Sequence, residues 1–315
     1  MGEGRRTLRP AIGTASFMAG LVLVLFALRW AALLGSETDR EFVEGDEFQV
    51  WMLVAAASVL LWLVVLMRGR GVLRTLMRRA PEEARRITLR DWFVHGCGLA
   101  ALTIAVVSVT SGLGGQEAPD VPIEHWRAIT WVLLVVAGVA VLPWIVGVWM
   151  THEQLQASKP RLKSLTQPGE EADGELERLR GSWRFIERAV LFLLAVVVSA
   201  TVMTGALRVA LVPEEVEESA FAASDVILYG AFFACVSAIV VLPLVASWRA
   251  KAFLLLDQVF PVTSRMTADQ ADARARLASA LNLDVSMFRS PLTVLGVLSP
   301  LLTSVLAVFV PQLGK

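Results

Sequence analysis

The residues of this chain that could do chemistry are few and scattered. His95 and Cys97 stand two residues apart, but no further cluster of metal ligands accompanies them, whereas a metal site needs several. His125, His152 and Cys235 each stand alone. The sequence lacks the HExxH motif of metalloproteases, the phosphate-binding P-loop and the GxSxG motif of serine hydrolases. We therefore predict a non-enzymatic protein with no catalytic residues, no metal and no cofactor.

Two arginines and two prolines are the residues within apolar segments to which we give a candidate functional role. Arg29 and Arg208 are the only charged residues in those segments, which hold no Asp, Glu or Lys. Each arginine lies near the end of its segment, so it either snorkels outward to an acidic loop or lines a pore. Pro143 and Pro243 each remove a backbone hydrogen bond, either as a packing kink or beside a substrate site.

The composition indicates that a membrane must position these residues. Of 315 residues, 56% are hydrophobic and 18% are charged, whereas soluble domains average about 25% charged residues. A helix needs about 20 apolar residues to cross a bilayer. The segments that meet this length are 11–34, 50–67, 93–112, 129–150, 189–211 and 226–247, with a seventh at 291–310 that two prolines interrupt. We therefore predict an all-α, polytopic bundle of six or seven transmembrane helices.

The first six segments form three hairpins of like orientation, which suggests an internal repeat. The sequence Val-Leu-Pro occurs at 141–143 and again at 241–243, each time followed within six residues by a tryptophan. Parallel repeats of helix pairs occur in some transporters, although a shared fold does not establish a shared function. The seventh segment would add an apolar helix at the C-terminus.

Charge in the connecting segments predicts the orientation. Eight arginines lie within 68–90, whereas 35–49 holds six acidic residues and one arginine. Basic loops stay in the cytoplasm, so the N-terminus is predicted to be cytoplasmic. With seven spans, the cytoplasmic segments hold 24 basic and 15 acidic residues, and the outer segments hold 3 basic and 14 acidic residues. The formal net charge of zero is thus a cancellation between two oppositely charged faces.

The predicted organisation follows from these spans. Residues 159–181 contain Pro160 and the sequence Gln-Pro-Gly, and we expect a turn or loop there, with a helix resuming near 175. Thr267-x-x-Gln270 fits a capping box at the start of a helix that ends near 282. The predicted segments are the N-terminus (1–10), hairpin 1 (11–67), a basic loop (68–92), hairpin 2 (93–150), a cytoplasmic loop (151–188), hairpin 3 (189–247), a cytoplasmic helical segment (248–290) and a seventh helix with the C-terminus (291–315).

The prediction for function is a subunit or anchor in the inner membrane of a bacterium. Its basic loop would contact anionic lipid headgroups, and its cytoplasmic segments would meet a protein partner or a second copy of the chain. A nucleic-acid partner is not expected, because no recognition module is visible. The alternatives are a channel, pore-forming effector or transporter that moves ions or small solutes, and an enzyme that acts on lipid-linked substrates.

Overall fold

The structure, a computed structural model, describes residues 4–36, 38–79, 122–165, 169–211, 223–262, 266–281, 283 and 298–306. Within these ranges every regular element is a helix. The elements are α1 (Gly4–Ala32), α2 (Arg40–Glu44), α3 (Asp46–Arg79), α6 (Trp126–Ala157), α7 (Lys159–Ser164), α8 (Glu170–Leu211), α9 (Ala223–Val259) and α10 (Ala268–Ala280). Residues 298–306 are also helical. The predicted all-α class is confirmed for the described part of the chain.

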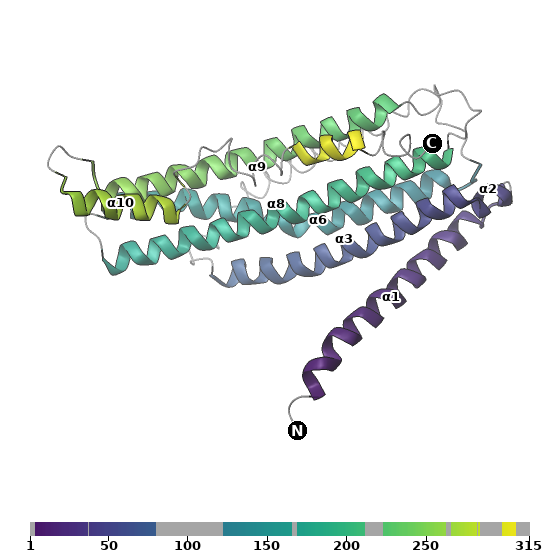
Figure 1. The fold of residues 1–315 in the computed structure, drawn as a ribbon, viewed down its shortest axis with the longest axis horizontal. Helices are drawn as coiled ribbons and strands as arrows, with labels where there is room; N and C mark the ends of the chain where they lie inside the picture. Colours follow the sequence, from purple (N-terminus) through teal and green to yellow (C-terminus); the bar gives the residue numbers. More distant parts are fainter. Residues whose placement is uncertain are drawn as a thin grey trace, which may run out of the picture.

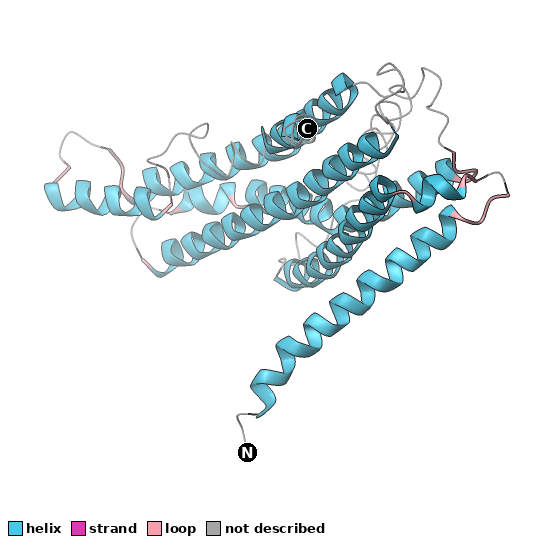
Figure 2. Ribbon diagram, turned by 45° about the vertical axis from the view of Figure 1, so that its right-hand side comes forward, coloured by secondary structure: helices cyan, strands magenta, loops and turns pink. Residues whose placement is uncertain are grey.

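Four helices are long and apolar enough to cross a membrane, and they correspond to α3, α6, α8 and α9. These four run side by side along the longest axis of the molecule, whereas α1 contacts α3 near α2 and diverges from the bundle toward its N-terminus (Figures 1 and 2). We call the two ends of this bundle the α2 end and the α10 end. The arrangement is that of a membrane helix bundle.

The number of spans stays a prediction. Predicted segments 50–67, 129–150, 189–211 and 226–247 lie within the four long helices. Segment 11–34 falls largely in α1, which runs from Gly4 to Ala32. Segment 93–112 lies outside the described residues, and of 291–310 only 298–306 is described. The internal repeat likewise stays a prediction, since half of its second hairpin lies in the segment that is not described.

Residues 159–181, predicted as a turn or loop, are mostly helical, so that prediction was wrong. Pro160 lies in the first turn of α7, where its missing N–H costs no helical hydrogen bond. The helix α8 begins at Glu170 and carries three acidic residues in its first turn, which favour a helix start because they face the positive end of the helix dipole. The same proline and acidic residues that suggested a loop thus mark two helix starts.

The predicted capping box at the start of α10 is confirmed. Thr267 accepts a hydrogen bond from the Gln270 backbone N–H, and the Gln270 side chain accepts one from the Thr267 backbone N–H. Arg274 then fastens α10 to the end of α9. Its guanidinium donates to the backbone oxygen of Leu256 at 3.2 Å and to Asp257 Oδ1 at 2.6 Å. These bonds satisfy groups at a helix C-terminus and hold α10 against the bundle.

Aromatic side chains pack against each other at the α2 end of the bundle. Phe42, Phe48, Trp51 and Trp126 form a row with ring centroids 5.0 to 5.2 Å apart. The Asp39 backbone N–H donates to the carbonyl of Pro122 at 2.9 Å, so this end also links two connecting segments. Adjacent aromatic rings stabilise such contacts by about 0.5–1.5 kcal/mol per pair beyond their burial.

Candidate functional site

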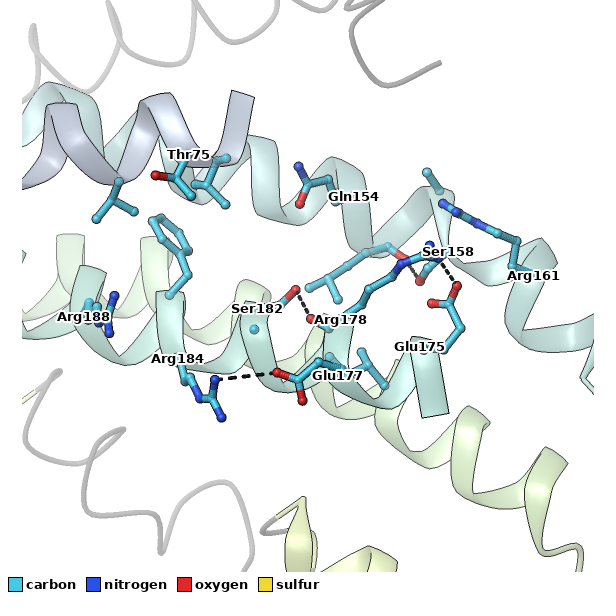
Figure 3. Close-up of a pocket in the computed structure, with 18 residues that line it drawn as sticks. Thr75, Gln154, Ser158, Arg161, Glu175, Glu177, Arg178, Ser182, Arg184 and Arg188 are labelled. Carbon is cyan, nitrogen blue, oxygen red and sulfur yellow. Dashed lines mark hydrogen bonds and ion pairs between the residues drawn. The ribbon is translucent and has the colours of Figure 1, made fainter. Parts of the chain in front are cut away.

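A basic cleft lies between α3, α6 and α8 near the α10 end of the bundle. Its volume is about 710 Å³. The side chains that surround it include ten polar or charged ones and an apolar floor (Figure 3). The polar and charged members are Thr75, Gln154, Ser158, Arg161, Glu175, Glu177, Arg178, Ser182, Arg184 and Arg188. Four guanidinium groups against two carboxylates give this cleft a positive charge.

Two of the four arginines are paired with the cleft's own carboxylates. Arg178 binds Glu175, whose side chain is 7% exposed and lies one turn earlier in α8. Arg184 Nη1 lies 3.7 Å from Glu177 Oε1, and both of these side chains are exposed. The buried carboxylate is therefore neutralised by a partner, as buried charges usually are. The exposed pair contributes little to stability, on the order of 0–1 kcal/mol.

The other two arginines provide the binding capacity of the cleft. Within the described residues, neither Arg161 nor Arg188 has a carboxylate partner within ion-pair distance. A guanidinium offers five donors in a planar fork that matches a carboxylate or a phosphate. Both carboxylates of the cleft are engaged, so it is suited to bind an anionic group rather than to transfer protons.

The three helices of the cleft pack tightly nearer the α2 end. Trp144 is 1% exposed, and its Nε1 donates a 3.0 Å hydrogen bond to the backbone oxygen of Val65 on α3. A Cβ on Gly69 would lie 2.7 Å from that same Nε1 atom, so only glycine allows this approach. Gly147 likewise brings α6 against the ring of Phe185 on α8. The cleft therefore lies directly beside the level at which α3, α6 and α8 pack closely against each other.

Other tryptophans hold neighbouring helices in the same way. Trp62 Nε1 donates to Ser199 Oγ at 2.8 Å and so links α3 to α8. Trp248 Nε1 donates to the backbone oxygen of Leu179 at 2.8 Å and so links α9 to α8. Hydrogen bonds between helices in a membrane average about 0.6 kcal/mol, and the indole rings add their burial.

None of the four candidate residues from the sequence lines the cleft. Arg29 forms an ion pair at 3.3 Å with Glu44, which belongs to the acidic segment 35–49. Arg208 lies half-buried in the last turn of α8, where a cation suits the helix dipole. Pro143 is buried beside Gly69, whereas Pro243 is exposed. The two prolines, although similar in sequence, have different surroundings.

Of three further residues considered in the sequence, His95, Cys97 and Cys235, the structure describes only Cys235. His95 and Cys97 lie outside the described residues, and no group of three potential metal ligands forms within the described part. Cys235, interpreted as a packed apolar residue, is exposed on the surface of α9, so that interpretation was wrong. Neighbouring residues of a helix point in different directions, so Cys235 lies on the outer side of α9 although Ala234 beside it is buried.

Three of the four cleft arginines were missed although they lie in the stretch that was predicted to be helical from near 175. Arg178, Ser182, Phe185 and Arg188 recur three to four residues apart and therefore share one face of a helix. That spacing is readable in the sequence itself. What no spacing indicates is that Arg161, from the separate helix α7, lines the same cleft.

No family model, no curated protein and no solved structure matches this chain.

Proposed function

We propose that this chain is a non-enzymatic, multi-pass protein of a bacterial inner membrane that anchors a protein partner at its cytoplasmic face. In this proposal six or seven helices span the bilayer, the N-terminus is cytoplasmic and the α10 end faces the cytoplasm. The arginines at the C-terminal end of α3 and the basic residues after α6 support that orientation, because basic segments are retained in the cytoplasm.

The observation that carries the proposal is the basic cleft at the α10 end. It offers Arg161 and Arg188 without an ion-pair partner among the described residues, beside an apolar floor that includes Leu76 and Phe185. A site with cationic walls and an apolar floor fits an acidic peptide segment that carries a hydrophobic side chain. Arginine is enriched at protein interfaces for this reason, and charge complementarity would also speed the encounter.

The alternative of a channel or transporter draws less support from the described helices. At the level of the bilayer, large side chains such as Trp62 and Trp144 fill the space between α3, α6 and α8. The groove of about 430 Å³ between α6, α8 and α9 is apolar, with Tyr229 and Ser237 among its few polar side chains. Ion pathways are lined by polar or charged groups, and such a lining does not appear among these residues.

Site-specific crosslinking in native membranes tests the anchoring proposal. A photoreactive residue in place of Ser182, which lines the cleft, should capture one defined protein, and the crosslinked peptide should be acidic. Arg161→Glu with Arg188→Glu should abolish that crosslink, because the reversed charges would repel an acidic segment. The matched control is Arg276→Glu on the exposed face of α10, which should leave the crosslink unchanged.

Two results would contradict the proposal. One is the absence of any protein crosslink from the cleft. The other is a crosslink that Arg161→Glu with Arg188→Glu leaves intact. Conductance or solute flux from the reconstituted chain, which Arg208→Ala alters, would favour the channel or transporter instead.

A further inference from the structure

Three of the four lysines of the chain gather where α6, α7 and α9 meet. Lys159 and Lys163 lie one turn apart on α7, and Lys251 comes from α9, about ninety residues later in the sequence. The helix α7 packs against α9, and the Lys251 ammonium bonds the side chain of Gln156, which lies three residues before Lys159. None of them lines the basic cleft, which Arg161 faces from the same short helix. The cluster is therefore a separate feature of the molecule.

Lys251 is the central member because it is buried. It is only 6% exposed, and its Nζ atom donates to Gln156 Oε1 at 3.4 Å, at the long limit for a hydrogen bond. An ammonium has three donors, and this is the one bond it makes within the described residues. No carboxylate of the described residues pairs with any of the three lysines.

Such an arrangement is unfavourable without an anion. A buried charge costs free energy unless it is paired and hydrogen-bonded, and one neutral amide at 3.4 Å does not provide that. Like charges four residues apart on a helix, as at Lys159 and Lys163, repel each other as well. Both penalties would be relieved by one multivalent anion held between α7 and α9.

We infer that Lys251, Lys159 and Lys163 form a binding site for a phosphate group. A phosphate supplies several acceptor oxygens, enough for three ammonium groups, and lysine binds phosphate as a point charge. Lys251 lies four residues beyond the predicted apolar segment 226–247, at the depth expected for lipid headgroups. The phosphate therefore belongs either to an anionic lipid or to a soluble phosphate. Gln156 would donate its amide N–H groups to the same ligand.

The test uses the full-length chain in nanodiscs and has two arms. In one arm the nanodiscs contain phosphatidylcholine with a minor fraction of phosphatidylglycerol, and native mass spectrometry counts the anionic lipids that remain bound after release. In the other arm the nanodiscs contain phosphatidylcholine alone, and inorganic phosphate is titrated while the midpoint of thermal unfolding is measured. Retained phosphatidylglycerol identifies a lipid ligand, and a rise in the midpoint with phosphate identifies a soluble one.

Charge-removing variants assign the binding to the cluster. Lys159→Gln with Lys163→Gln changes only exposed positions and should weaken binding by on the order of tenfold or more. Lys251→Met should abolish binding and raise the unfolding midpoint of the ligand-free protein, because it removes a buried charge beside two like charges. A lysine that serves only to bond Gln156 would give the opposite shift. The matched control, Arg276→Gln, removes an exposed charge from α10 and should bind as the parent does.

The inference fails if neither arm shows binding. It also fails if the double variant of α7 binds as tightly as the parent, or if Arg276→Gln weakens binding equally, since general charge would then explain the attraction. If Lys251→Met does not fold, the double variant decides the question by itself. These outcomes do not depend on the basic cleft or its partner, because the lysines lie outside that cleft.

Discussion

The helices α3, α6 and α8 pack closely at one level of the bundle and surround a cleft at another. Around Trp144, the helices α3, α6 and α8 are in close contact, and glycines remove the side chains that would separate them. Farther toward the α10 end, the same helices surround a cleft of about 710 Å³ with four arginines (Figure 3). Residue size and charge at the contact positions account for the difference.

The comparison teaches how a membrane bundle combines a rigid part with a binding part. In lipid, helices associate through close packing and hydrogen bonds, since lipid is as apolar as the helices themselves. Gly69 and Gly147 supply the close approach, and Trp144 supplies a hydrogen bond. Beyond that junction, guanidinium groups such as those of Arg161 and Arg188 line the cleft, where they need water or an anion as a partner.

The largest expected effect is at the packed level. Trp144→Ala removes a fully buried indole and its hydrogen bond, and should lower the free energy of unfolding by about 3–5 kcal/mol. The control is Trp131→Ala on the same helix, where the side chain is 51% exposed and the loss should be about 0.5 kcal/mol or less. Unfolding in mild detergent measures both. Equal losses would contradict the distinction between the packed face and the exposed face of α6.

A smaller effect is expected at the glycine that allows the approach of α3 and α6. Gly69→Ala places a Cβ about 2.7 Å from Trp144 Nε1 and should destabilise by about 1–3 kcal/mol. Gly71→Ala is the matched control, because a Cβ there meets no atom within 4 Å. Alanine favours helix over glycine, so this control should stabilise by up to about 1 kcal/mol. Two changes of the same sign and size would refute the close-approach explanation.

The smallest effect on stability is expected in the cleft. Arg161→Gln with Arg188→Gln breaks no ion pair among the described residues and should change the free energy of unfolding by about 0.5 kcal/mol or less. The same double variant should still weaken capture of an acidic partner. A loss of several kcal/mol would instead mean that these arginines hold the bundle together. Thermal unfolding and crosslinking of one preparation separate the two roles.

The sequence was informative where the signal is local. Long apolar runs predicted α3, α6, α8 and α9, and the Thr267–Gln270 box predicted the start of α10. Local patterns misled at 159–181, because proline and acidic residues occur both in loops and in the first turn of a helix. Arg29 was predicted to meet an acidic loop, and it pairs with Glu44.

The sequence alone determined that the chain is helical, apolar and divided into segments of opposite charge. These properties depend on neighbours within a few turns, and each residue carries its hydrophobicity and charge wherever the chain folds. Only the tertiary structure decided that Arg161 and Arg188 share a cleft and that Lys251 of α9 lies beside Gln156 and the helix α7. Such arrangements join segments that are distant in the sequence, and they depend on which helices pack closely together. The size of the side chains at Gly69, Gly147 and Trp144 determines that close packing.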